Sequence, residues 1–186
     1  NPQTMVDGVL RACGRPHTAE DVLRAYRQAE NAGYKAINMD LIAGLPTDDL
    51  SGFRHSLDTV ASLSPANITV HTLALKKGSR ILLEGSKIPT AEEVGAMLDY
   101  ANPTLRAHGF APYYLYRQKN MAGNFENVGY AMPGKAGIYN ILIMEEKQSI
   151  VALGAGSTSK AVFPGGRIER ADNVKDVEIY MSRIDE

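Results

Sequence analysis

The sequence predicts an α/β fold built from repeating strand–helix units. Three observations predict it: strand and helix patterns alternate along the first part of the chain, two strand patterns begin 31 residues apart with a helix pattern between them, and two helices open on capping boxes. This spacing is typical of a βαβ unit, whose strands are parallel and joined by a right-handed crossover. A run of such units forms either an open doubly wound sheet or a barrel, and in both the chemistry lies at the carboxyl ends of the strands.

The first predicted helix of this series opens on a capping box. Thr18 followed by Asp21 provides that motif, apolar residues recur behind it at helical spacing, and Gly33 supplies the left-handed residue that ends the helix. Residues 36–42 then alternate with the period of a strand. One face of this strand carries Ile37, Met39 and Leu41, and the other carries Asn38, Asp40 and Ile42.

The next two strands follow in the same rhythm. A helix is predicted over residues 49–63, and residues 67–74 form a strand on which Thr69, His71 and Leu73 share one face. Thr90 and Glu93 then form the second capping box, and we expect Pro103 to kink the helix behind it.

Residues 111–116 are the third predicted strand, and the rhythm changes after residue 117. The following segments are, in order, a long loop over 120–137, an apolar stretch over 138–144 that fits a strand or a helix, a hairpin of strands over 150–163 and 167–171, and a helix over 174–184. We therefore divide the chain into residues 1–117, which carry the βα units, and residues 118–186, an α+β extension packed on them as one structural unit.

Composition excludes several classes of function. A chain of 186 residues with 44% hydrophobic and 22% charged residues is typical of a soluble globular domain. Its formal net charge of -1 gives no electrostatic reason to expect nucleic acid or a membrane surface as a partner, and its apolar runs are too short to span a bilayer. The single cysteine, Cys13, rules out an internal disulfide or a cysteine-bound cluster held by this chain alone, and it fits a cytoplasmic location.

Three polar residues are candidates for ligand binding. Asp40 lies near the carboxyl end of its strand on the face opposite the apolar residues, so its carboxylate could accept two hydrogen bonds from vicinal hydroxyls such as those of a ribose; the alternative is a bond to a neighbouring backbone N–H or a lysine. Gln3 could end a preceding strand, or belong to a disordered terminus. Arg15, just before a capped helix, could bind a carboxylate, although most exposed arginines do not.

Other candidates favour structural roles. Residues 154–157 resemble a backbone nest for anions, but the G-x-G-x-x-G pattern is incomplete and a β-bulge or a close backbone approach is the better interpretation. No histidine has a second histidine or cysteine at metal-ligand spacing, and His71 is interpreted as a satisfied core or surface residue. Cys13 is expected to be packed, and the tyrosines at 113, 114 and 116 to be half core and half surface.

Four segments carry a resemblance to a known family: Asn1-Pro2-Gln3-Thr4, Gly14-Arg15-Pro16-His17-Thr18, residues 37–46 and Leu153-Gly154-Ala155-Gly156-Ser157. In this order and spacing they resemble the oxygen-independent coproporphyrinogen III oxidases of the radical S-adenosylmethionine (SAM) class. The tail resembles the Firmicute-type variant, at Tyr139-Asn140, Met144-Glu145-Glu146-Lys147 and residues 173–177. The stretch from Asn38 to Pro46 is the most specific part of the resemblance.

This resemblance implies a fold, a reaction and cofactors. The fold is the C-terminal half of a partial (β/α) TIM-like barrel of the radical SAM type, with an α+β C-terminal extension. The full-length protein is expected to hold a [4Fe–4S] cluster on a Cys-x3-Cys-x2-Cys loop that this chain lacks, and to cleave SAM reductively to a 5′-deoxyadenosyl radical. That radical would start the oxidative decarboxylation of coproporphyrinogen III propionates to protoporphyrinogen IX, an oxidoreductase step of haem biosynthesis that needs a tetrapyrrole substrate and an electron donor.

The resemblance also implies SAM contacts in this chain, and the catalytic residues themselves remain unknown. Gln3, Arg15 and Asp40 match residues that contact SAM in the family, and Ala74 matches a position against the adenine. Lys160 falls near a further contact position at which an apolar residue is expected. We expect Gln3, Arg15 and Asp40 to converge on one concave face.

Two other functions stay open. One is a non-catalytic paralogue that binds haem, another tetrapyrrole or a protein partner; the other is a different barrel enzyme that uses Asp40 as an acid or base. The chain begins without a methionine and ends inside a helical pattern, so we expect part of a longer protein that is inactive alone. Strands left unpaired at the truncated edge are expected to invite self-association.

Overall fold

The structure is a computed structural model that describes residues 1–74, 87–117 and 122–183. The chain divides into two compact units, Asn1–Gly137 and Ile138–Glu186, and each is described by itself. The first unit consists of α1 (Asp7–Ala12), α2 (Ala19–Asn31), β1 (Asn38–Ala43), α3 (Leu50–Ser62), β2 (Asn67–Thr72), α5 (Ala91–Ala107), β3 (Ala111–Tyr116), the short helix η1 (Ala122–Asn124) and β4 (Asn127–Ala131).

The helices begin where their capping residues predict. Thr18 and Asp21 form a complete capping box at α2, and Thr90 and Glu93 form another at α5. Gly33 follows α2 with φ +89°, a left-handed conformation that costs glycine little. The helix α5 continues through Pro103 to Ala107.

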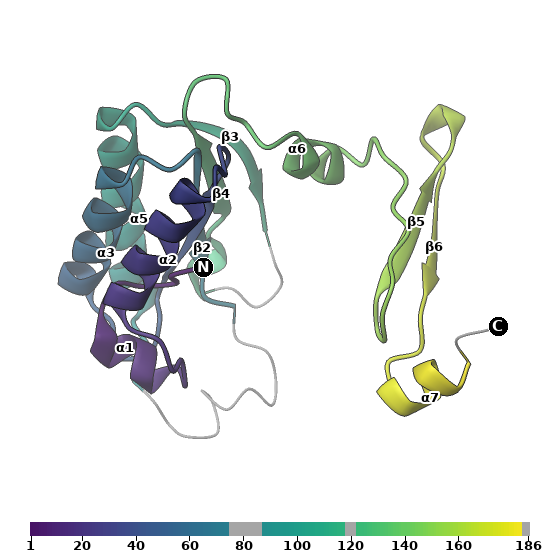
Figure 1. The fold of residues 1–186 in the computed structure, drawn as a ribbon, viewed down its shortest axis with the longest axis horizontal. Coiled ribbons are helices and arrows are strands. Elements are labelled where there is room, and N and C mark those ends of the chain that lie inside the picture. Colours follow the sequence, from purple (N-terminus) through teal and green to yellow (C-terminus); the bar gives the residue numbers. More distant parts are fainter. Residues whose placement is uncertain (75–86, 118–121, 184–186) are drawn as a thin grey trace. The chain divides into compact units, whose positions relative to one another are not determined.

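Four strands form one mixed sheet in the order β1-β2-β4-β3 (Figure 1). As predicted, β1 and β2 are parallel, with Asp40 opposite Thr69 and Ile42 opposite His71. The prediction of a loop over residues 120–137 is wrong in part, because residues 127–131 form β4, which pairs antiparallel with both β2 and β3. Two of the five residues of β4 are Gly129 and Ala131, which have low strand propensity, so the sequence of β4 indicates a strand only weakly. Pairing with β2 and β3 stabilises β4 as a strand.

The core lies between the sheet and its helices. Met39, Leu41 and Ala43 of β1 point into it together with alternate residues of β2. The largest side chains that are fully buried include Phe53 and Leu57 of α3 and Met97 of α5. The predicted face assignment of β1 is therefore confirmed, and Asn38, Asp40 and Ile42 lie on the opposite face of the sheet.

The second unit contains α6 (Ile138–Met144), β5 (Thr158–Val162), the short helix η2 (Pro164–Gly166), β6 (Ile168–Asp172) and α7 (Val177–Ser182). The ambiguous stretch over 138–144 is thus a helix, and the predicted hairpin is confirmed as an antiparallel β5–β6 pair. The predicted strand over 150–163 is shorter than expected, although Ile150 still makes an isolated bridge to Lys160.

The structure divides after Gly137, whereas the sequence places the boundary after residue 117. The difference arises because β4 lies inside the first sheet, between β2 and β3. The packing of the extension on the barrel stays a prediction.

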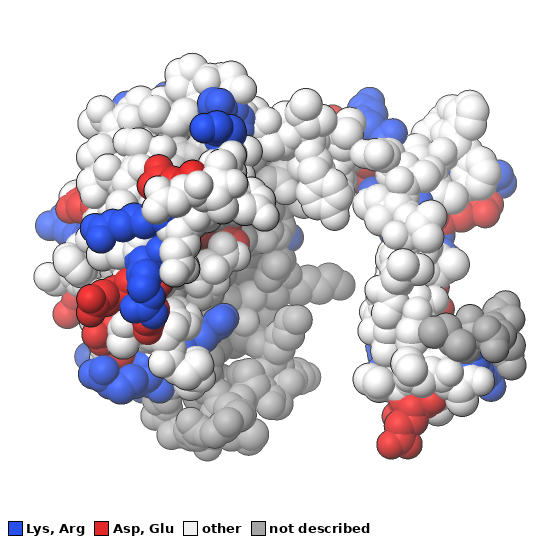
Figure 2. Space-filling model, viewed as in Figure 1, with Lys and Arg blue, Asp and Glu red and all other residues white. Residues whose placement is uncertain are grey.

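The described surface carries charges of both signs. Figure 2 shows them interspersed over the part of the molecule that α1 and α2 occupy, where Arg24 pairs with Asp21. Among the helices described, none is long and apolar enough to cross a membrane.

Candidate functional site

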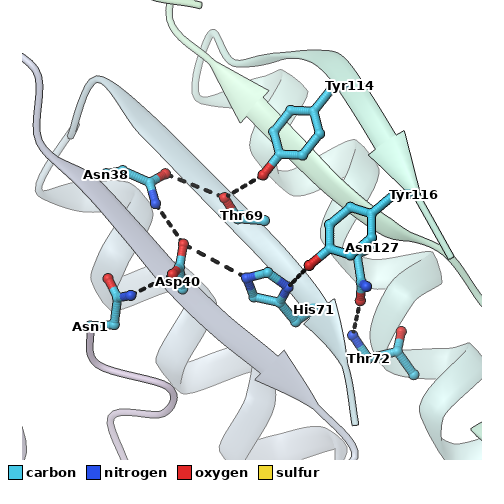
Figure 3. Close-up of polar contacts among 9 residues, drawn as sticks. All are labelled: Asn1, Asn38, Asp40, Thr69, His71, Thr72, Tyr114, Tyr116 and Asn127. Atoms are coloured by element: carbon cyan, nitrogen blue, oxygen red, sulfur yellow. Dashed lines mark hydrogen bonds and ion pairs between the residues drawn. The ribbon is translucent and has the colours of Figure 1, made fainter. Parts of the chain in front are cut away.

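The candidate site is a polar network on the sheet face opposite the core (Figure 3). Its centre is Asp40 on β1, whose side chain is 17% exposed. Asp40 stands there because strand residues alternate between faces and its neighbours Met39 and Leu41 occupy the core side. The predicted face of Asp40 is confirmed, but β1 continues to Ala43, so Asp40 lies in the middle of the strand and not near its carboxyl end.

Two asparagine amides donate to the Asp40 carboxylate. The Asn38 Nδ2 group lies 2.6 Å from Oδ1, and the Asn1 Nδ2 group lies 2.5 Å from Oδ2. Burial alone would raise the pKa of Asp40, but its contacts with His71 and Asn38 outweigh burial and hold the pKa below its ordinary value. Asp40 is therefore an ionised acceptor at neutral pH.

A line of polar residues leads from β3 to Asp40 across the sheet. Thr69 Oγ1 donates to Asn38 Oδ1 at 3.3 Å and also contacts the Tyr114 hydroxyl at 3.3 Å. Because the single hydroxyl hydrogen of Thr69 is used on Asn38, Tyr114 is the donor in the second contact. Burial raises the pKa of Tyr114, which keeps this hydroxyl protonated.

A glycine in β4 makes this line possible. Gly129 lies in register with Thr69 on one side and Tyr114 on the other. A Cβ atom at Gly129 would lie 1.8 Å from Cε1 of Tyr114, so the tyrosine ring covers the glycine directly. Only a residue without a side chain lets Tyr114 reach over β4 to Thr69.

A second line runs through His71. The Tyr116 hydroxyl lies 3.2 Å from His71 Nδ1, and His71 Nε2 lies 3.8 Å from Asp40 Oδ1. The second separation is longer than a hydrogen bond. The rings of Tyr114 and Tyr116 are stacked, with an interplanar angle of 3°.

The structure brings Gln3 next to Asp40. The Gln3 N–H donates to the Asp40 carbonyl and the Gln3 carbonyl accepts from Ile42, both at 2.9 Å, so Gln3 forms a parallel bridge beside β1. Gln3 has φ +65°, a left-handed conformation that is costly for a residue with a side chain. The next residues are tied to α3, where Ser56 Oγ contacts the Thr4 hydroxyl and accepts from the Met5 N–H.

Ala74 and Arg15 lie in loops of the same unit. Ala74 is half-buried two residues beyond β2, and the preceding Leu73 donates to the carbonyl of Ala43 at the end of β1. Arg15 is exposed after α1, and its guanidinium pairs with no carboxylate of the described residues. The contacts of the described residues thus join Gln3 to Asp40 but do not join Arg15 to them.

Lys160 lies in the second unit, on β5. It is buried, its backbone pairs with Ile150, and its Nζ lies 3.8 Å from Glu146 Oε1. Its partner within the unit is therefore this carboxylate, and its role as a SAM contact stays a prediction.

In the Gly154–Ser157 segment three of the four N–H groups are occupied by the protein, which argues against an anion nest. Gly154 N–H donates to the Tyr180 hydroxyl, Gly156 N–H to the Val174 carbonyl and Ser157 N–H to the Gly154 carbonyl. The described residues contain no group of three histidine, cysteine or acidic side chains that could hold a metal. Cys13 is half-buried, and burial raises the pKa of its thiol, so it is not activated.

Apart from Asp40, the members of the network were not selected from the sequence; they are Asn1, Asn38, Thr69, His71, Tyr114 and Tyr116. The available signal was the register of the parallel pair, since strands that begin at residues 36 and 67 place Thr69 and His71 beside Asp40. Nothing local could place the tyrosines, because β3 reaches β2 only across the unpredicted β4.

A pocket of about 500 Å³ lies beside the site, between α2 and β1. It meets the network only at Asn1 and Asn38, and its other lining residues include Tyr26, Ile37 and Met39. It is therefore separate from the carboxylate that dominates the chemistry.

The fold is shared with a radical SAM enzyme. The chain superposes with a TM-score of 0.72 on coproporphyrinogen III oxidase (HemN) from Escherichia coli, over 98% of this chain and 42% of that one, at 18% sequence identity. Because the chain superposes on less than half of that protein, it has part of the radical SAM fold. This confirms the predicted fold class.

Sequence comparison finds relatives that are more similar to the chain than this structure is. It is 44% identical, over its whole length, to the oxygen-independent coproporphyrinogen-III oxidase-like protein HemZ of Bacillus subtilis, of which it spans 38%. It is also 27% identical to the haem chaperone HemW of the same organism and 26% identical to HemW of Escherichia coli, spanning 45% and 44% of their lengths. No protein-family model matches the chain. The chain thus resembles a portion of a coproporphyrinogen oxidase-like radical SAM protein and spans less than half the length of these relatives.

Proposed function

We propose that the chain is the SAM-facing portion of a radical SAM oxidase that decarboxylates coproporphyrinogen III in the cytoplasm. The chain by itself is inactive in this proposal. The observation that carries the proposal is the parallel backbone bridge that brings Gln3 beside Asp40 on β1, in a chain 44% identical to HemZ. Both residues match family positions that contact SAM.

The two implied cofactors fit this chain differently. An ionised carboxylate surrounded by amide donors suits the vicinal hydroxyls of a nucleoside, so Asp40 fits the ribose of SAM, with Gln3 beside it. A [4Fe–4S] cluster does not fit, because the chain has one cysteine. No step of the reaction is therefore derived through the cluster in this chain.

Each of the five candidate SAM-contact residues has one role in the proposal. Asp40 accepts ribose hydroxyls, Gln3 orients the ligand through its amide, and Ala74 leaves room for the adenine at the end of β2. Arg15 binds the carboxylate of SAM, and Lys160 supplies a further contact from the second unit. When bound, SAM supplies the hydrogen-abstracting chemistry, while these residues hold and orient it.

The test uses the full-length protein with its cluster reconstituted. Calorimetric titration with SAM is expected to show that Asp40→Asn weakens binding by about tenfold, the usual effect of losing a charged hydrogen-bond acceptor. The exposed Asp99→Asn is the matched control and is expected to bind as the wild type does. Unchanged affinity in Asp40→Asn would overturn the assignment of Asp40.

A second arm separates the alternative functions. HemW relatives, named as haem chaperones, motivate titration of the same protein with haem. Tight haem binding without decarboxylation of coproporphyrinogen III would support a non-catalytic paralogue. Activity of the 186-residue chain without iron or SAM would support a different enzyme that uses Asp40 as an acid or base.

A further inference from the structure

The histidine beside Asp40 belongs to a feature that the proposed function does not use. Two chains of polar contacts start on the stacked tyrosines of β3 and reach the same oxygen of Asp40, Oδ1, the second across a separation of 3.8 Å that is longer than a hydrogen bond (Figure 3). One passes from Tyr114 through Thr69 and Asn38. The other passes from Tyr116 through His71.

The direction of donation in the second chain follows from its ends. Asp40 is ionised and can only accept, so the nitrogen that faces it, His71 Nε2, carries the proton. In the neutral imidazole Nδ1 is then an acceptor, and the Tyr116 hydroxyl donates to it at 3.2 Å. Tyr116 therefore fixes both the tautomer and the plane of the ring.

Both side chains of the His71–Asp40 pair are mostly shielded from water. They are 26% and 17% exposed, so the carboxylate depends on protein donors for much of its solvation. The first donor chain and His71 occupy the side of Oδ1, while Oδ2 has one described partner, the Asn1 amide. Oδ2 is thus the oxygen that can exchange a protein amide for a hydroxyl of a ligand.

We propose that His71, oriented by Tyr116, is a positioning residue that fixes Oδ1 of Asp40 and thereby presents Oδ2 to a ligand hydroxyl. The inference rests on the proposed function, since SAM is the ligand whose ribose Asp40 would bind. It goes further by assigning the carboxylate's orientation to a histidine on the neighbouring strand and a tyrosine two strands beyond it.

The test compares side chains that keep or remove the donor. In His71→Gln the amide Nε2 can take the place of the ring Nε2, whereas His71→Phe keeps a planar ring and removes both nitrogens. In the full-length reconstituted protein we expect SAM to bind about tenfold more weakly to His71→Phe, and His71→Gln to recover most of the loss. Tyr116→Phe should weaken SAM binding by a smaller factor, because the His71 ring remains and loses only the hydroxyl that orients it.

The control is a tyrosine with a similar contact on the other side of the molecule. Tyr100 on α5 donates to Asp58 on α3 through its hydroxyl, so Tyr100→Phe removes an equivalent bond away from the site. Its SAM affinity is expected to equal that of the wild type.

A double substitution distinguishes positioning from stability. If His71 acts through Asp40, His71→Phe has no further effect on SAM affinity in the Asp40→Asn background. The positioning role would be overturned if the losses of SAM affinity in the double variant were additive. It would also be overturned if His71→Gln bound SAM as weakly as His71→Phe does. Failure of Asp40→Asn alone to weaken SAM binding would instead overturn the proposed function, so the two failures are distinguishable.

Discussion

Among single residues, Asp48 has the most unusual carboxyl group of the described chain. Its side chain is buried in the loop before α3, where Oδ1 accepts from the Asp49 N–H at 3.0 Å. The other oxygen, Oδ2, is buried without a hydrogen-bond partner among the described residues. Burial raises the pKa of Asp48 to about 6. Ionisation of this group is therefore unfavourable in the folded state.

This raised pKa predicts a stability that depends on pH. The folded carboxyl keeps its proton up to about pH 6, whereas the unfolded one releases it near the ordinary value of 3.8, so the free energy of unfolding falls as pH rises between these values. Asp48→Asn removes the charge and is expected to stabilise the chain by about 1–3 kcal/mol at pH 7.5. The gain should shrink toward pH 4.

Urea denaturation at pH 7.5 and pH 4 measures the effect. Asp99→Asn, on the exposed side of α5, is the control and should change stability by less than about 0.5 kcal/mol at either pH. An Asp48→Asn chain that is no more stable than the wild type at pH 7.5 would contradict the prediction.

At the scale of elements, β4 is a central strand, and the ring of Tyr114 on its neighbour β3 covers Gly129. We expect Gly129→Ala to displace Tyr114 from Thr69, because the added Cβ would overlap the ring, and to destabilise the chain by about 1–3 kcal/mol. Thermal unfolding checks the stability. In the Tyr114→Ala background, where the ring is absent, the cost of Gly129→Ala should largely vanish.

A glycine without neighbours is the matched control. A Cβ atom at Gly8 in α1 would meet nothing within 4 Å, so Gly8→Ala is expected to be neutral or to stabilise the chain by about 0.5–1 kcal/mol. Equal costs at Gly129 with and without Tyr114 would show that the ring is not what excludes a side chain there.

The elements also show why part of the site was predictable and part was not. The β1–α3–β2 unit follows from local periodicity and caps, and the alternation of β1 then places Asp40 on the face opposite the core, although in mid-strand and not at the expected strand end. The role of Gln3 came from resemblance, since a backbone bridge at φ +65° has no local sequence signal. The tyrosines could not be placed, because their contacts depend on β4, whose weak pattern is overridden by pairing with β2 and β3.

For the whole molecule, the open side of β1 predicts self-association of the isolated chain. β1 is an edge strand of its sheet, and within the described residues only the single bridge of Gln3 lies on its outer side. Edge strands with unpaired N–H and C=O groups pair readily with other chains. Light scattering of the 186-residue chain is expected to show dimers or larger species. A monodisperse monomer would contradict this, and the full-length protein measured in parallel is the control.

The position of β4 also orders events during synthesis. β4 is the last strand of the first sheet to leave the ribosome, yet it lies between two strands that were made before it. Until residue 131 has emerged, one edge of β2 stays open and the hydroxyls of Tyr114 and Tyr116 have no strand to cross. The environment of Asp40 is therefore completed late in biogenesis, and a nascent chain stalled before residue 127 would expose the edge of β2 to chaperones.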